Sequence, residues 1–234
     1  MKHAIMVMGS GYQSGVLQEL INHFDDHEID FFIHWDRKFP LPSLNSKYSK
    51  IIFIPRIKVY WGTCTQIYAE KELLKNVRAY KRKYDYVHLI SSSDIPLMTK
   101  EYFKRFFKKS LYLGYVSNAE QDQWRLAYYY PINKLNLRQH RYIIGAIKSI
   151  NKLLSVNRLK GKNVRIEKGF NWFSISSNYI DRVLDYSHME IFNHTFLADE
   201  TYLQTILADK KPKVIKKDDN TMAARYIDWK RGEP

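Results

Sequence analysis

Short apolar runs alternate with stretches of helical periodicity along most of the chain. Apolar runs bounded by turn residues predict strands at residues 3–8, 29–34, 50–54, 84–90, 111–116 and 172–176. Apolar positions three and four residues apart predict helices at residues 16–24, 65–80, 100–107, 177–186 and 199–207. Strands that alternate with helices are typical of an α/β fold with a mostly parallel central sheet.

A further helix is predicted at residues 143–154, and it is basic as well as amphipathic. Apolar side chains recur at helical spacing, and lysines lie on another face: Ile143, Ile147, Ile150 and Leu154 against Lys148 and Lys152. Two interpretations stay open for residues 141–160. The segment could lie on an anionic membrane surface, or it could bury its apolar face in the core.

The chain of 234 residues is long enough for one domain with a substantial core. No internal repeat, low-complexity tract or clear linker divides it, so we expect a single domain over residues 1–234. An apolar share of 45% argues against disorder. The aromatic share of 15% is high, and tyrosines can either stack on sugar rings or fill the edge of a core.

The net charge of +14 indicates an anionic partner, such as a nucleotide phosphate, a nucleic acid or an acidic membrane surface. The charge is uneven, since the segment from Arg138 to Lys168 holds nine Lys or Arg and a single acid, Glu167. One cysteine, Cys64, allows no intrachain disulfide and favours a reducing compartment. The sequence shows neither a signal peptide nor a spanning helix. We therefore expect a cytoplasmic protein, with peripheral attachment to the inner face of the membrane left open.

Two acidic residues follow predicted strands, Asp36 after residues 29–34 and Asp94 after residues 84–90. In open parallel sheets, ligands bind at the carboxyl ends of the strands, where a carboxylate can accept hydrogen bonds from sugar hydroxyls. A turn-forming Asp that bonds its own backbone is an equally good interpretation of each.

Five segments of the chain share an order and spacing with a known family. They are residues 31–36 (FFIHWD), Trp61-Gly62 continuing to residues 86–97 (YVHLISSSDIPL), residues 165–176 (RIEKGFNWFSIS), Asp199-Glu200 and residues 225–229 (RYIDW). This set resembles glycosyltransferase family 14, the core-2/I-branching β-1,6-N-acetylglucosaminyltransferase and xylosyltransferase group. The resemblance is weak between residues 100 and 165. It implies a GT-A-like, Rossmann-like α/β/α sandwich, with a nucleotide-sugar half at residues 1–100 and an acceptor and catalytic half at residues 101–234.

The resemblance also assigns a catalytic base. Without it, Asp199 is a helix N-cap and Glu200 a surface residue. With it, Glu200 is the base of an inverting transfer that removes the proton of the acceptor hydroxyl, and Asp199 keeps the cap. The implied donor is a UDP-sugar, with UDP-N-acetylglucosamine first by family habit.

No convincing Asp-x-Asp pair for a metal is present. The resemblance implies that basic side chains, and not a metal, stabilise the leaving diphosphate. The implied donor-binding residues are Gly9, Asp36, Asp94, Arg225, Lys230 and Arg231. Family members carry phosphate-binding residues beyond the RYIDW segment, whereas this chain stops at Pro234. We therefore expect either a truncated chain or basic groups from elsewhere in it.

The implied acceptor is a glycan or lipid-linked glycan hydroxyl. Trp229 matches an aromatic position that stacks on the acceptor sugar, and Trp172 belongs to a strand that borders the site. The other implied acceptor contacts are Trp61, Glu120 and Arg125, next to Trp124.

Two other function classes stay open. The turn Gly9, Gly11 and Gly15 follows a strand and opens a helix, and Asp36 lies where a ribose-binding acid would, as in NAD(P)-dependent oxidoreductases. That interpretation leaves residues 61–97 and 165–205 unexplained. The net charge with interleaved tyrosines would suit a protein that binds nucleic acid, but no recognition motif supports it, and we expect no nucleic-acid partner.

Overall fold

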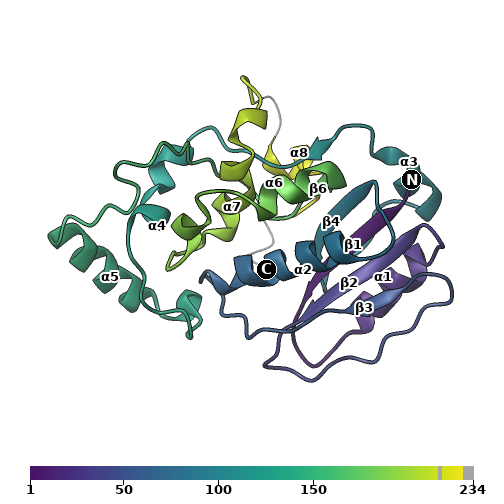
Figure 1. The fold of residues 1–234 in the computed structure, drawn as a ribbon. Coiled ribbons are helices and arrows are strands. Elements are labelled where there is room, and N and C mark those ends of the chain that lie inside the picture. Colours follow the sequence, from purple (N-terminus) through teal and green to yellow (C-terminus); the bar gives the residue numbers. More distant parts are fainter. Residues whose placement is uncertain (216–217, 229–234) are drawn as a thin grey trace.

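Six strands form one sheet in the order β3-β2-β1-β4-β6-β5 in the computed structural model, which describes residues 1–215 and 218–228 (Figure 1). The strands are β1 (His3–Gly9), β2 (Ile29–Trp35), β3 (Ile51–Phe53), β4 (Tyr86–Ser91), β5 (Leu111–Tyr112) and β6 (Ser174–Ser176). The first four neighbours run parallel, and β6 runs antiparallel to both β4 and β5. The predicted α/β fold with a mostly parallel sheet is confirmed.

The helices agree with the periodicity in most places. They are α1 (Gly15–Phe24), α2 (Thr65–Ala79), α3 (Lys100–Phe106), α4 (Trp124–Ala127), α5 (Arg141–Leu153), α6 (Ile180–Leu184), α7 (Asp199–Ile206) and α8 (Asp219–Met222). Short 3-10 turns are η1 (Ala119–Asp122), η2 (Leu137–Gln139), η3 (Ser177–Tyr179), η4 (Met189–Phe192) and η5 (Ala208–Lys210). Two expectations need correction. The strand predicted at residues 111–116 ends at Tyr112, and the helix predicted at residues 177–186 is split into η3 and α6.

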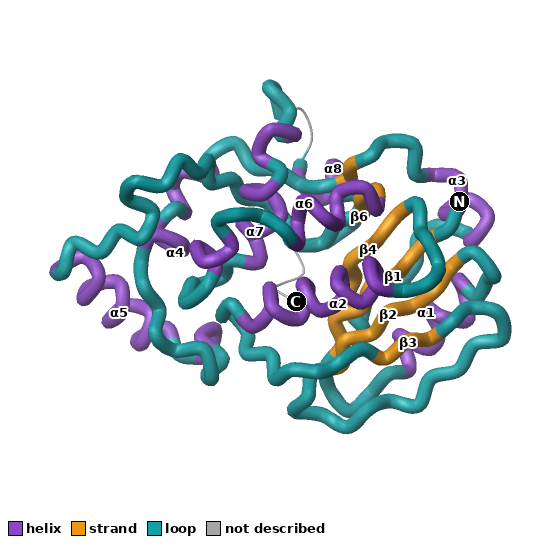
Figure 2. The backbone as a smooth tube through the Cα atoms, in the orientation of Figure 1, coloured by secondary structure: helices purple, strands orange, loops and turns teal. Residues whose placement is uncertain are grey.

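Alternating side chains of the strands bury both faces of the sheet. On one face, Ile5 and Val7 of β1 pack with Leu17 and Ile21 of α1, and α3 lies on the same side. On the other face, Met6 packs in the core that includes residues of α2, α6 and α7. Figure 2 shows α2 and α6 on the side of the sheet opposite α1. Because alternate residues of a strand point to opposite faces, the sheet packs against helices on both sides. The result is an α/β/α arrangement.

The register brings several strand ends together. Gly9 pairs with Trp35 of β2, and Met8 pairs with Ser91 of β4. The carboxyl ends of β2, β1 and β4 therefore lie side by side, which is the edge where an open parallel sheet binds ligands.

The helix α5 lies at the end of the molecule opposite the sheet (Figure 1). It is attached by Ile147, which is buried with Tyr130, Leu137 and Phe196 in a separate apolar cluster. Within residues 1–215 and 218–228, no helix is long and apolar enough to cross a membrane.

Candidate active site

Glu200 lies in the first turn of α7 and contacts two cations. Its Oε2 atom is 2.6 Å from Arg125 Nη1 and 3.6 Å from Lys168 Nζ. Asp122 joins the same cations, at 3.2 Å from Arg125 Nε and 2.7 Å from Lys168 Nζ. We call these four residues the Glu200 cluster. The Glu200 side chain keeps 35% of its surface exposed, so its carboxylate is fixed in place and still accessible.

The backbone beside the Glu200 cluster depends on a glycine. Gly169 donates its N–H to the carbonyl of Glu200 at 2.9 Å, and the preceding carbonyl of Lys168 accepts from Val116 N–H at 2.9 Å. A Cβ atom on Gly169 would lie 2.0 Å from the carbonyl oxygen of Gly114. Only glycine lets this segment pass so close to residue 114 while it holds Lys168 beside Glu200.

The charges of the Glu200 cluster compensate one another. Partial burial of Asp122 would raise the pKa of its carboxyl, but the hydrogen bond from Lys168 and the charges of Arg125 and Lys168 outweigh burial. The pKa of Asp122 therefore lies below its ordinary value. The cluster holds two carboxylates and two cations in a partly solvated environment.

Asp199 does not cap α7 as the sequence predicted. The N-cap position is Ala198, and no side chain caps this helix. The Asp199 carboxyl is buried, and its Oδ2 accepts from Gln66 Nε2 at 3.0 Å and from Asn171 Nδ2 at 3.5 Å. Burial, together with the charge of Glu200, raises the pKa of Asp199 to about 7. The capping prediction was wrong because side-chain amides from distant segments draw the carboxyl into the core.

Gln66 links two of the sequence motifs. Its Nε2 binds Asp199, and its Oε1 accepts from the N–H of Gly62 at 2.7 Å. Gly62 has a φ of +80°, a conformation that favours glycine, and its carbonyl accepts from Leu197 N–H at 3.0 Å. The turn that carries Trp61 is therefore fixed against the start of α7, and the Trp61 side chain is partly exposed.

Gly9 and Asp36 meet at the carboxyl edge of the sheet, where Asp36 N–H donates to the Gly9 carbonyl at 2.8 Å. A Cβ on Gly9 would lie 2.2 Å from the Trp35 ring, so glycine allows the indole to cover the strand end. The buried Asp36 carboxylate accepts from the backbone N–H of Lys38 at 3.0 Å and of Val59 at 3.2 Å. These contacts anchor loops, and a role for Asp36 toward a donor stays a prediction.

Asp94 lies past the end of β4 and accepts from Ser91 Oγ at 2.6 Å. Arg225 is half-buried nearby, and its Nη2 donates to the carbonyls of Leu89 at 3.1 Å and Phe173 at 2.8 Å. Burial lowers the pKa of Arg225 to about 10, and the charge of Asp94 opposes that shift. The guanidinium joins β4 to the start of β6, and its binding to a diphosphate stays a prediction.

The remaining predicted site residues lie in different surroundings. Glu120 is exposed on η1, one turn before Arg125, and Trp172 is half-buried against the main core. Trp229, Lys230 and Arg231 lie outside the described residues. Among the described residues, no group of three or more His, Cys, Asp or Glu side chains could hold a metal ion.

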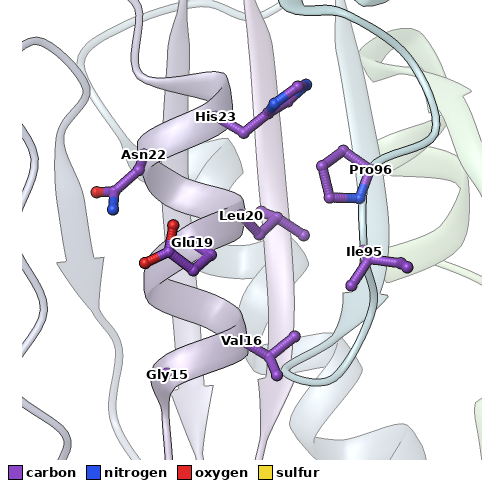
Figure 3. A pocket seen from close by; sticks show the side chains of 8 residues that line it. All are labelled: Gly15, Val16, Glu19, Leu20, Asn22, His23, Ile95 and Pro96. Atoms are coloured by element: carbon purple, nitrogen blue, oxygen red, sulfur yellow. The ribbon is translucent and has the colours of Figure 1, made fainter.

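A cavity of about 760 Å³ lies between α1 and the loop that follows β4 (Figure 3). Val16 and Leu20 of α1 face Ile95 across it. None of the site residues predicted for a glycosyltransferase lines this cavity, although Gly15 of the alternative dinucleotide turn does. None of the described residues that line it is Lys or Arg. Its chemistry does not suit a diphosphate, so the Glu200 cluster and the strand ends are the stronger candidate site.

Comparison with known proteins decides the family. The family model described as Branch: Core-2/I-Branching enzyme matches residues 4–234. The chain belongs to this family. A search of curated proteins found no match. The core-2/I-branching enzymes of glycosyltransferase family 14 transfer sugars, so this family member is a glycosyltransferase.

Family membership over nearly the whole chain replaces the alternative interpretations, an NAD(P)-dependent oxidoreductase and a nucleic-acid-binding protein. Two glycines of the proposed dinucleotide turn also serve the fold itself. Gly9 accommodates Trp35, and Gly11 has a φ of +96° in a turn with open space around it.

Sequence reasoning missed several partners in the candidate site of this glycosyltransferase. Asp122 carried one available signal, its i,i+3 spacing from Arg125, which allows an ion pair on one helical turn. Lys168 stood in one of the family segments without a role. Gln66 and Asn171 carried no local signal, because their contacts to Asp199 span 133 and 28 residues.

Proposed function

We propose that this family member moves N-acetylglucosamine from a UDP-sugar to a hydroxyl of a glycan or lipid-linked glycan, with inversion at the anomeric carbon. Glu200 acts as the general base, and no metal is required. The observation that carries this proposal is a partly exposed carboxylate held by Arg125 at 2.6 Å in the first turn of α7. A family member needs one such base for a single displacement.

The reaction is one displacement. The acceptor oxygen forms a bond to the anomeric carbon, the bond from that carbon to the diphosphate oxygen breaks, and UDP leaves from the opposite face. The acceptor proton passes to Glu200. Because Arg125 and Lys168 both approach Oε2, we assign Oε1 as the atom that takes the proton.

Arg125 and Lys168 orient the base, because both contact its Oε2 atom, at 2.6 and 3.6 Å. Glu200 lies in the first turn of α7, at the positive end of the helix dipole. Trp61 and Trp172 offer aromatic surface for a sugar ring, and Glu120 offers a carboxylate for its hydroxyls.

The UDP-sugar lies in this proposal at the strand ends, near Gly9, Asp36 and Asp94. Developing negative charge on the leaving diphosphate is stabilised by basic side chains, for which Arg225, Lys230 and Arg231 are the candidates. Arg225 already binds carbonyls of the sheet, so it would serve from a fixed position.

The base assignment is tested with Glu200→Gln, which keeps the size of the side chain and removes its charge. We expect transfer to fall by a factor of about 100 or more, with UDP binding by calorimetry unchanged. Glu101→Gln is the matched control, because Glu101 is an exposed glutamate in the first turn of α3. Turnover of Glu200→Gln equal to that of the control would refute the base.

Donor and metal are tested on the same protein. UDP release is measured with a panel of UDP-sugars in excess EDTA, and the anomeric configuration of the product is read by NMR. We expect activity with UDP-N-acetylglucosamine in EDTA and an inverted product. Activity that appears only after addition of a divalent cation would overturn metal independence, and a retained anomer would overturn the single displacement.

A further inference from the structure

The helix α5 carries two apolar faces. Its inner face holds Ile147 in an apolar cluster and buries Asn151, whose side chain exchanges hydrogen bonds with the backbone of Tyr129 at 2.7 and 3.0 Å. The inner face is therefore fully used by the protein. Ile143 and Ile144 of α5 also pack against this cluster, so the inner face attaches the helix to the protein.

The outer face of α5 exposes large apolar side chains. Tyr142 is 95% exposed, Leu153 84%, Leu154 66% and Ile150 54%. Tyr142, Ala146, Ile150 and Leu153 follow the i, i+4, i+8 and i+11 spacing of one helical stripe. Exposed leucines occur singly on many surfaces, but four large apolar residues within one short segment form a patch that calls for a partner.

The same surface is cationic. Residues 141–154 contain Arg141, Lys148 and Lys152 and no acid. Arg141 and Lys152 are exposed along one side of the apolar stripe. Exposed apolar side chains flanked by cations are the pattern of helices that lie in the interface of a bilayer.

We propose that the outer face of α5 docks on an anionic lipid bilayer. Arg141 and Lys152 contact the headgroups, and Tyr142, Ile150 and Leu153 enter the boundary with the acyl chains. A nucleic acid would use the cations and leave the apolar residues without a partner. A symmetric second copy would bring two sets of like charges together. The bilayer satisfies both features at once.

Docking through α5 would place the candidate active site close to the lipid. Lys148 Nζ lies 3.7 Å from the ring centroid of Trp124, and Trp124 precedes Arg125, which holds Glu200. This part rests on the proposed function and narrows its acceptor to glycans carried on a membrane lipid.

Vesicle flotation tests the docking surface without relying on activity. The full chain is mixed with vesicles of phosphatidylcholine alone, or of phosphatidylcholine with phosphatidylglycerol, at low and high salt. We expect flotation with the anionic vesicles that weakens at high salt. The double variants Tyr142→Glu with Leu153→Glu, and Arg141→Glu with Lys152→Glu, should each lose about tenfold or more in partitioning.

Two controls match these variants. Leu41→Glu adds a carboxylate at another exposed leucine, and Lys81→Glu with Lys83→Glu makes the same charge change in the turn between α2 and β4. Both controls should float as the original chain does. Thermal melts confirm that each variant is folded, and Glu200→Gln should float normally, which separates docking from catalysis.

Several results would overturn the proposal. They are no flotation with anionic vesicles, equal flotation of the α5 variants and the controls, a dimer in solution that Leu153→Glu dissociates, and binding of RNA or DNA in place of vesicles.

Discussion

Arg125 Nη1 lies 2.6 Å from Glu200 Oε2, although 75 residues separate the two in the chain. Arg125 is itself held by Asp122 at 3.2 Å, and Asp122 also binds Lys168. The carboxylate that the family resemblance marks as a base is thus positioned by a closed set of charges. The short α4 helix carries Arg125 and so places its guanidinium beside Glu200.

The first prediction concerns Arg125 as a positioning residue. Arg125→Ala should lower kcat by about tenfold to hundredfold, because a misplaced base loses its alignment with the acceptor hydroxyl. Arg125→Lys should restore part of the rate, and UDP affinity should not change. Steady-state kinetics separate this role from acceptor binding, since loss of an acceptor contact alone would raise the acceptor KM and leave kcat intact.

The second prediction concerns Asp199, whose pKa is raised from 3.8 to about 7, chiefly by burial. Between these values the folded protein holds a proton that the unfolded chain has released. The stability that Asp199 contributes is full below the lower value and is lost as the pH rises through the upper one. Relative to the original chain, Asp199→Asn should therefore gain roughly 2–4 kcal/mol of unfolding free energy across this window.

Denaturant unfolding of both proteins across the window measures that gain. The asparagine side chain of the variant cannot titrate, and its carbonyl can still accept from Gln66 Nε2, the main partner of Asp199. A difference between the two proteins that does not change with pH would contradict the buried, proton-holding carboxyl.

The third prediction compares two glycines. A Cβ on Gly169 would lie 2.0 Å from the Gly114 carbonyl oxygen, whereas a Cβ on Gly145 of α5 would meet nothing within 4 Å. Gly169→Ala should destabilise the protein by roughly 2–3 kcal/mol through overpacking. Gly145→Ala should stabilise it by about 0.5–1 kcal/mol, because alanine favours the helix. Thermal melts of both variants decide, and equal melting temperatures would refute the close approach at residue 169.

The fourth prediction concerns the buried pair His3 and His88, whose ring nitrogens lie 2.9 Å apart. Burial lowers the pKa of His3 from 6.5 to about 4 and the pKa of His88 well below its ordinary value. At acidic pH, His3 and His88 therefore bind protons more readily in the unfolded chain than in the folded protein. This contribution to stability is therefore present above 6.5 and is lost as the pH falls toward 4.

When the pH falls from about 7 to about 5, protonation of His3 in the unfolded chain should by itself lower the free energy of unfolding by about 2 kcal/mol. Denaturant midpoints at the two pH values measure the loss. His3→Gln, which keeps a hydrogen-bonding side chain, should show a smaller loss over the same interval. An equal loss in the variant would show that His3 does not titrate on unfolding.

The sequence by itself determined the order of strands and helices, because local periodicity records which residues face a core. It also supplied the family through segments such as Asp199-Glu200 and Trp61-Gly62. The family match over residues 4–234 confirms that part. The predicted end of a strand was wrong where strand pairing sets it, as at Tyr112. The length of the partner strand, and not the local pattern, limits the ladder there.

Only the tertiary structure decided which groups surround the candidate base. Lys168 reaches Asp122 and Glu200 through the packing of three separate segments, and no local spacing encodes those contacts. The same holds for Asp199, whose sequence context favours a solvated helix end while Gln66, 133 residues away, draws it inside. The neighbours of a side chain in the folded protein set its burial and its charge state, and those contacts form only when the chain folds.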